Sequence, residues 1–313
     1  MKGIIAVIFS TLLFAPAAMA LDIEPLDTDP ARSTFIEGYE AAAAKDTKKA
    51  REKFEQALQE AASIKARNKA EEEFAESARL QIAFFSNYFL AMIDSEGGDN
   101  NSAVKRLEAM FENEKACNAK VFFIYPVKGG MNEPMSKADD LRTFLNKAAD
   151  LHTRTRLACF GSKGRGYAFL GVQYRAREEY QKSADMLTKF IDMKPKEGVE
   201  YALYLRAEDY VFLNRYKEAI ADLDRVLAKN PRHANGLAVR CAAKLNVYRT
   251  GGRKDKDILL NAEKDCNAAA TIEPGNGIVK VYRTYMNRYL DELRTGKRRE
   301  EEDLSDLGEY FGK

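Results

Sequence analysis

The sequence predicts an all-α fold in which helical hairpins stack along the chain. Strong helix formers dominate the composition, charged residues make up 31% of the 313 residues, and tryptophan is absent. Short breakers rich in glycine or proline separate successive helical patterns. No segment alternates apolar and polar residues convincingly, as a half-buried strand does. These observations favour helices joined by short turns over an α/β or all-β architecture.

The first twenty residues are typical of a secretory signal peptide. Lys2 provides a positive start, an apolar run covers residues 4–14, and A-M-A at residues 18–20 has the form of a cleavage site. The apolar run is too short for a membrane span. Cleavage would leave a flexible leader over residues 21–33 and no integral membrane segment. Because Leu21 stands where a lipid-anchored protein needs cysteine, we expect a protein of the periplasm or the extracellular space.

Charge and residue content argue against several kinds of site. Lys and Arg number 50 against 48 Asp and Glu, so no strong field attracts nucleic acid or an anionic membrane. The only histidines, His152 and His233, have no histidine or carboxylate at helical ligand spacing. No catalytic motif is recognisable. We therefore expect no catalytic residues, no metal and no cofactor.

A repeat is marked by three prolines that end successive units. At twelve and at eight residues before each proline, the units carry a matched small or apolar residue. A further small residue recurs earlier in each unit, and the third unit is longer by nine residues, which fall in the segment RTGGRKDKD at 249–257. The matched positions are Ser183, Ala219 and Ala262, then Leu187, Leu223 and Cys266, then Gly171, Ala207 and Cys241, before Pro195, Pro231 and Pro274. Small residues let two antiparallel helices approach closely, and large ones fill the seam with the next hairpin.

This pattern resembles the tetratricopeptide repeat (TPR) family. Tyr167-x2-Leu170-Gly171-x2-Tyr174 matches the signature of its first helix, with tyrosine in place of tryptophan. The resemblance implies helix–turn–helix units and an exported bacterial TPR protein. The expected organisation is degenerate hairpins over 34–163 with an insertion around 118–156, three units at 164–199, 200–233 and 234–275, a capping helix at 276–296 and a charged tail at 297–313.

The resemblance also implies a function. First helices of TPR units line a concave groove that binds a protein or peptide, so we expect a non-enzymatic scaffold or adaptor, with envelope assembly or secretion as a typical setting. The matching groove positions are Arg165, Arg175, Tyr201, Tyr204, Glu208, Phe212, Asn235 and Asn246. Aromatic anchors among polar groups suit an extended peptide or a partner helix. The alternative is that these aromatic residues pack against the insertion or the neighbouring repeat. The sequence leaves the oligomeric state open.

Four cysteines in an exported chain suggest disulfides. In the TPR register Cys241 and Cys266 occupy facing positions of one hairpin, and a bond there would close about 25 residues and contribute roughly 3 kcal/mol. A second pair, Cys117 and Cys159, follows by elimination. The alternative is buried free thiols.

The segment GSKGRGY at 161–167 superficially resembles a phosphate-binding loop, but it fits neither the Walker nor the dinucleotide pattern. We predict a connection between two helices. Arg154, Arg156, Lys163 and Arg165 cluster near the expected helix start, so an alternative function is the binding of a small anion, a phosphate or an acidic glycan. A second alternative is an enzyme with an unrecognised site in the 118–156 insertion.

Overall fold

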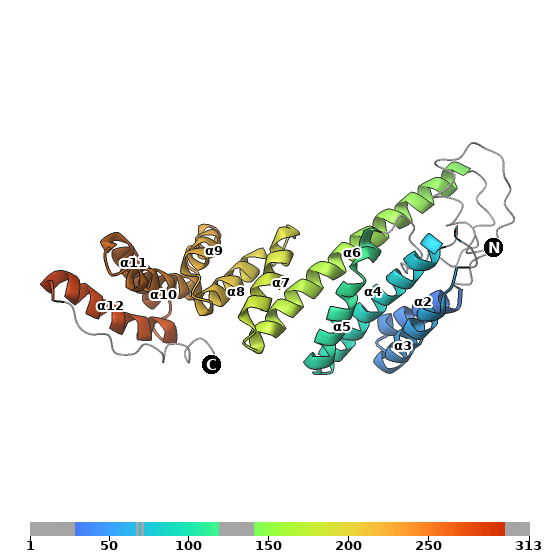
Figure 1. The fold of residues 1–313 in the computed structure, drawn as a ribbon, viewed down its shortest axis with the longest axis horizontal. Helices are drawn as coiled ribbons and strands as arrows, with labels where there is room; N and C mark the ends of the chain where they lie inside the picture. Colours follow the sequence, from blue (N-terminus) through green and yellow to red (C-terminus); the bar gives the residue numbers. More distant parts are fainter. Residues whose placement is uncertain (1–28, 67–68, 70–71, 119–140, 298–313) are drawn as a thin grey trace. The chain divides into compact units, whose positions relative to one another are not determined.

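The structure is a computed structural model, and it describes residues 29–66, 69, 72–118 and 141–297, without the side chains of residues 29, 74 and 141–156. Within these ranges every regular element is a helix, which confirms the predicted all-α hairpin fold (Figure 1). The expected signal peptide, residues 119–140 of the expected insertion and residues 298–313 of the tail lie outside the described residues. The chain divides into two compact units, Met1–Gly166 and Tyr167–Lys313.

The first unit contains two helical hairpins. Each hairpin turns tightly into a second helix that begins with an aspartate cap: Asp46 accepts from the backbone N–H of Lys49, and Asp99 from that of Ser102. The core between the hairpins is aromatic, with the rings of Phe54 and Phe89 stacked 5.1 Å apart. The helices are α2 (Asp29–Ala43) with α3 (Thr47–Ser63), α4 (Glu72–Glu96) with α5 (Asn100–Glu112), the short 3-10 helix η1 (Glu114–Asn118), and the first part of α6 (Leu141–Ala176).

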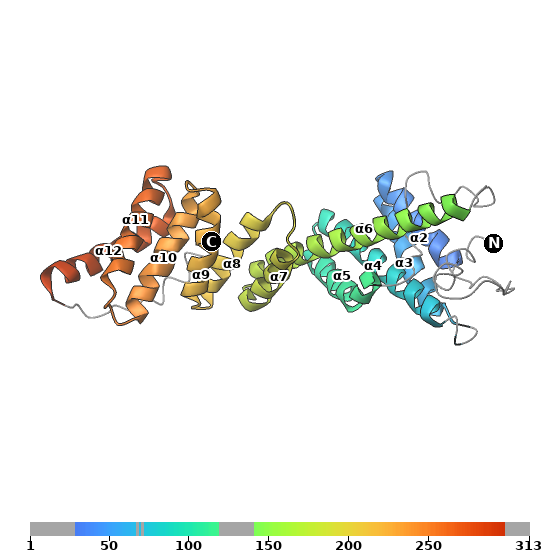
Figure 2. The same ribbon diagram turned by 90° about the horizontal axis from the view of Figure 1, so that it is seen from above.

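The second unit continues with further hairpins and a final helix (Figure 2). The end of α6 packs on α7, α8 pairs with α9, and α10 with α11. Each of these pairs coincides with one repeat unit of the sequence. The helices are α7 (Tyr180–Asp192), α8 (Val199–Phe212), α9 (Tyr216–Lys229), α10 (Ala234–Thr250), α11 (Lys256–Ile272) and α12 (Gly277–Thr295). Among the described helices, none has the length and apolar content that a membrane span requires.

Two predictions about the ends of helices are wrong. Residues 161–166 are not a connection but lie inside the continuous helix α6. Gly166 shows why glycine is present there, since a Cβ at this position would lie 2.9 Å from Met110 Cε and 3.0 Å from Phe111 Cζ of α5. The expected leader also ends early, because α2 begins at Asp29. Pro30 suits the first turn of that helix, because a backbone N–H at this place would have no acceptor within the helix.

Gly171 marks the close approach that the repeat predicts. A Cβ on this residue would lie 2.8 Å from both Cδ2 and Cγ of Leu187, so α6 and α7 approach more closely than an alanine would allow. Leu187 is itself buried and fills the seam toward α8, in a cluster with Leu203 and Val226. Gly171 therefore allows the close approach of two helices and Leu187 fills the seam with the next hairpin, as the repeat pattern predicts.

A half-buried arginine in α8 links two successive hairpins. Arg206 donates through Nε and Nη2 to both carboxylate oxygens of Asp222 in α9, each at 2.8 Å. Its Nη1 donates to the hydroxyl of Thr188 in α7. This bidentate geometry is the strongest form of an arginine–carboxylate contact.

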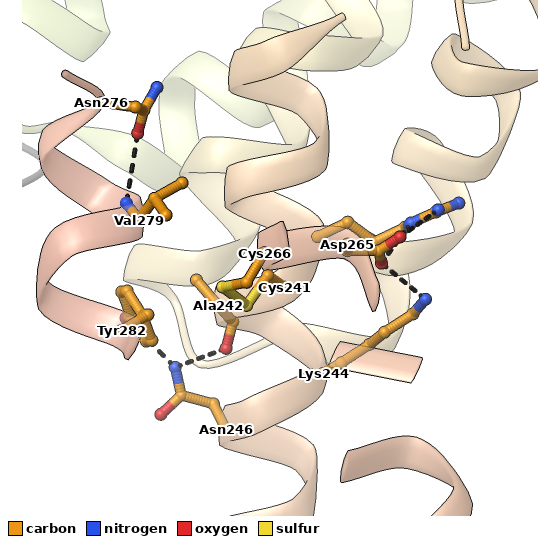
Figure 3. The surroundings of a disulfide bond; sticks show 10 residues. Cys241, Ala242, Lys244, Asn246, Asp265, Cys266, Asn276, Val279 and Tyr282 are labelled. Carbon is orange, nitrogen blue, oxygen red and sulfur yellow. Dashed lines mark hydrogen bonds and ion pairs between the residues drawn. A yellow bond between two sulfur atoms is a disulfide. The ribbon is translucent and has the colours of Figure 1, made fainter. Parts of the chain in front are cut away.

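Arg240 in α10 repeats this arrangement one unit later. It donates through Nε and Nη2 to Asp265 of α11, and through Nη1 to Asp224 of the preceding hairpin. Lys244 adds a third cationic contact to Asp265 at 2.7 Å (Figure 3). Because both arginines stand directly before the small residue of their first helix, they occupy the same place in the repeat.

The last helix, α12, caps the array as predicted. Tyr282, Met286 and Tyr289 are buried in one cluster with the cysteine pair of α10 and α11. The nine-residue addition also holds this helix, since Arg253 from that loop forms a buried pair with Glu292 of α12 at 3.0 Å. The guanidinium of Arg253 lies 4.8 Å from the centre of the Tyr289 ring. The added loop therefore anchors the cap.

Candidate functional site

The most promising surface in the second unit is one face of α8, which we call the α8 face: Tyr201, Tyr204 and Glu208, together with Arg175 of α6. The three α8 residues recur at intervals of three and four and so share one side of the helix. Their exposure falls along that side, from Tyr201 at 61% to Tyr204, half-buried, and Glu208 at 8%. The exposed ring of Tyr201 therefore lies at one end of this face, and a buried group of polar side chains, which we call the base of the α8 face, lies at the other.

Arg175 organises this base. Its Nη2 donates to Glu208 Oε2 at 2.8 Å, and its Nη1 donates to Asp209 Oδ1 at 2.5 Å. The Ser183 hydroxyl donates to the other oxygen of Asp209, and the Tyr204 hydroxyl donates to Glu208 Oε1. Every oxygen of both carboxylates thus accepts a hydrogen bond, which offsets the cost of burying them.

Two carboxyl groups share a single guanidinium here, and burial raises the pKa of both. Burial raises the pKa of Asp209 to about 6, against the opposing effects of Ser183 and Arg175. Burial also raises the pKa of Glu208. Burial, and next the charge of Glu208, raise the pKa of the Tyr204 hydroxyl. For both acids the desolvation outweighs the hydrogen bonds and the charge of Arg175, so each carboxyl group holds its proton more tightly than a solvent-exposed one does.

Two aromatic contacts complete the surroundings. The ring of Phe212 stacks on that of Tyr180 at 4.2 Å, and the Arg175 guanidinium lies 5.8 Å from the Phe212 ring centre. The Tyr204 ring lies 5.1 Å from that of His233. His233 accepts a hydrogen bond through Nδ1 from the Gly236 N–H and so caps the start of α10. Phe212 accordingly packs against the neighbouring repeat, which is the alternative considered for the aromatic residues.

The remaining predicted groove residues do not join the α8 face. Asn246 is buried, and its amide donates to the Ala242 carbonyl and lies 3.4 Å from the Tyr282 hydroxyl of α12 (Figure 3). The capping helix α12 therefore covers Asn246, so this side chain cannot contact a partner. Asn235 is exposed and accepts from the side chain of Asn276. Arg165 belongs to the first unit, where its Nη1 donates to the Tyr88 hydroxyl.

The structure lacks the helix start on which anion binding by the basic cluster at residues 154–165 was predicted. Residues 161–166 are internal to α6, so no helix start and no free backbone N–H groups are present there. Lys163 pairs with Glu114 at 3.1 Å. The side chains of Arg154 and Arg156, and residues 119–140 of the insertion considered for an enzyme site, lie outside the described residues.

The cysteines lie in the two expected pairs. Cys241 and Cys266 are bonded within the α10–α11 hairpin, with 5.4 Å between their Cα atoms, and both are fully buried (Figure 3). Cys117 and Cys159 join η1 to α6 with a Cα separation of 5.5 Å. Nowhere in the described ranges do three or more His, Cys, Asp and Glu side chains gather as metal ligands would.

The pairs of Arg206 and Arg240 with the buried aspartates Asp222 and Asp265 are the polar feature that the sequence analysis missed. A signal is present in the sequence: Arg206 and Arg240 both precede a repeat-defining small residue, and Asp222 and Asp265 both precede a seam residue. Comparing polar residues between units, in addition to small and apolar ones, would have revealed them.

No protein-family model and no curated protein matches the chain. Among solved structures, it is similar to the TPR2AB domain of yeast Sti1 in a complex with pHSP90, at 14% identity and a TM-score of 0.33, over 85% of this chain and 99% of that one. It is also similar to the TPR domain of P58(IPK), at 14% identity and a TM-score of 0.37, over 86% of this chain and 81% of that one. Both are TPR domains, the family that the repeat pattern resembles. Similarity this low says nothing about what this chain binds.

Proposed function

We propose that this chain is a non-enzymatic scaffold or adaptor that binds a protein or peptide partner on the α8 face. The observation that carries the proposal is Tyr201, which is 61% exposed at the edge of a helix whose other aromatic residues are partly or fully buried. Tyrosine is among the residues that contribute most to protein interfaces, because it combines a large apolar area with a polar end.

The base beneath Tyr201 supports the same function. Glu208 holds the Tyr204 hydroxyl, and Arg175 holds Glu208, so the half-buried Tyr204 ring is fixed before a partner arrives. Side chains that are already ordered lose little conformational freedom on binding, and this favours affinity. The network has no exposed nucleophile or free acid that a reaction would require, which favours binding over catalysis.

We further propose that the protein acts in the periplasm or outside the cell, in a setting such as envelope assembly or secretion. Two features support an oxidising compartment: the signal-like N-terminus and the two cysteine pairs, which use all four cysteines of the chain. The α8 face would then serve a partner that is itself exported.

Site-specific crosslinking tests the proposal. A photoreactive residue is placed at Tyr201 in the cell envelope of the native host, and at Leu260 of α11 as a matched control, since Leu260 is also exposed, at 41%. We expect a protein crosslink at position 201 that is absent at position 260. Purified wild-type chain added in excess should compete for the partner, and the Tyr201→Ala variant should compete at least tenfold less well. Equal crosslinking at both positions, or equal competition by the two chains, would contradict the proposal.

A further inference from the structure

Two arginines share one carboxylate near the end of α12. Arg253 donates through Nη1 to Glu292 Oε2 at 3.0 Å, and Arg288 Nε lies 3.8 Å from Glu292 Oε1. The Arg253 side chain is 5% exposed, whereas that of Arg288 is 20% exposed. Only the Nε atom of Arg288 is buried without an acceptor, and its Nη1 and Nη2 form no hydrogen bond with a described residue, so they are open to solvent. Arg288 is thus an accessible cation whose acid is already neutralised by Arg253.

Arg249 of α10 adds a second accessible cation. Its Nε and Nη2 donate to Oδ1 of Asn246, whose amide in turn donates to the Tyr282 hydroxyl at 3.4 Å (Figure 3). Burial raises the pKa of that hydroxyl to about 12, with smaller effects from Arg249 and Tyr285, so both side chains lie near it. Arg249 is half-buried and forms no ion pair with a described residue, and its Nη1 is not buried.

These cations flank a partly exposed tyrosine. Tyr285 lies one turn before Arg288 on the same side of α12. Its ring packs on the buried cluster of α10 to α12 but keeps part of its surface exposed. We call Arg249, Tyr285 and Arg288 the arginine surface. It offers two guanidinium groups and an apolar ring to a partner that is both acidic and apolar.

The stretch EEEDLSDLGEYF at residues 300–311 has that composition. It contains six acidic residues, no basic residue and four large apolar ones. The three basic residues at 297–299 cannot neutralise it, since acids still exceed bases by three over 297–311. Opposite charges attract the stretch to the arginine surface. The α8 face has no such match, because its cation, Arg175, already binds Glu208 and Asp209. Residues 300–311 lie outside the described ranges.

The chain is long enough to bring this stretch to the arginine surface. α12 ends at Thr295, and Gly296 follows in the left-handed conformation, with φ of 68°. A helix rises about 1.5 Å per residue, so Arg288 lies about 10 Å along the axis before Thr295. The five residues from Thr295 to Glu300 span up to about 17 Å. The acids at 300–303 can therefore reach Arg288, and the residues after them can reach Arg249.

We propose that residues 300–311 of this chain bind the arginine surface. Their acidic side chains pair with Arg288 and Arg249, and their apolar side chains pack against Tyr285. The bound stretch would add a covering layer to the last helix, and a stacked array needs such a cap at its end. The arginine surface shares no residue with the α8 face, so this inference does not depend on the function proposed for that face.

Photocrosslinking in the purified full chain tests the inference. A photoreactive residue replaces Leu304, and mass spectrometry locates the residue to which it couples. A mixture of isotopically heavy and light chains separates coupling within one chain from coupling between two. We expect coupling within one chain, to α12 or to the end of α10. Raising the salt from about 0.05 M to about 1 M should lower the yield about threefold or more, because salt screens exposed charges.

Charge variants provide the second readout. Replacing Arg249 and Arg288 together by glutamine should lower the coupling about threefold or more. Arg283→Gln is the matched control and should change nothing, because Arg283 is exposed on another side of the same helix. Circular dichroism checks that the double variant remains folded. Replacing the four acids at 300–303 by their amides leaves every described helix intact and should lower the coupling equally.

Four results would overturn the inference. Coupling between two chains would assign the surface to a second copy of the protein. Coupling to the α8 face would place the stretch on the site proposed for the partner. The other two are the absence of any coupling to α10 or α12, and coupling that neither salt nor the amide variant at 300–303 reduces.

Discussion

The two glycines Gly161 and Gly171, ten residues apart in the same helix, should respond in opposite ways to one additional methyl group. At Gly161 a Cβ would meet no atom within 4 Å. Alanine there adds only its preference for the helical backbone, so Gly161→Ala should raise the free energy of unfolding by about 1 kcal/mol.

At Gly171 the same methyl would lie 2.8 Å from two atoms of Leu187, closer than real Cβ contacts. Leu187 is 1% exposed and packed on its other sides, so it cannot move away. Overpacking of this kind costs about 2 kcal/mol and exceeds the helix preference of about 1 kcal/mol. Gly171→Ala should therefore lower the free energy of unfolding by about 1 kcal/mol, which leaves the two variants about 2 kcal/mol apart.

Urea unfolding followed by far-UV circular dichroism measures both free energies, and calorimetry separates the transitions if the two units unfold independently. Each variant is the control for the other, because the residue change and the helix are the same. A destabilised Gly161→Ala protein would show that residue 161 is not in an open helical position. A Gly171→Ala protein as stable as Gly161→Ala would refute the close approach of α6 and α7.

Two further predictions concern the second unit. Replacing both Cys241 and Cys266 by alanine should lower the free energy of unfolding by about 3–4 kcal/mol, from the entropy of a 25-residue loop, as measured by urea unfolding; a loss under 1 kcal/mol would contradict this account. The raised pKa of Asp209, about 6 in the folded chain, means that the folded state binds the proton more tightly than the unfolded state does. Its contribution to stability is therefore fully present below about pH 4 and is lost as the pH rises through 6, so relative to Asp209→Asn the wild type should be about 1 kcal/mol more stable at pH 5 than at pH 7. Parallel stability profiles for the two proteins would argue against a raised pKa.

The hairpins and the facing cysteines were predictable because they depend on spacing within one repeat. Prolines and small residues recur at fixed intervals, so Cys241 and Cys266 could be placed opposite each other from the sequence alone. The continuity of α6 could not be predicted in this way. Glycine weakens a helix locally, and only the packing of Gly166 on α5 shows why the helix tolerates it.

The candidate site was predicted in part. Tyr204, Glu208 and Arg175 were all expected to face the groove, and the structure brings them together because Tyr204 and Glu208 lie one turn apart in α8 and Arg175 reaches Glu208 from α6. Asn246 occupies an equivalent position but is covered by α12, and the sequence does not reveal which faces the last helix covers. The signal peptide, the cellular setting and the partner remain predictions.

The placement of the arginines has a consequence for how the second unit comes apart. Arg175, Arg206 and Arg240 each contact an acid or hydroxyl in a hairpin other than their own. Separating the α6–α7 and α8–α9 hairpins would break the charge-assisted hydrogen bonds of Arg175 to Glu208 and Asp209. Arg206 and Arg240 would each keep their bidentate aspartate, because Asp222 and Asp265 lie in the same hairpins as these arginines. The contacts of Arg175 should therefore make the α6–α7 and α8–α9 hairpins unfold together.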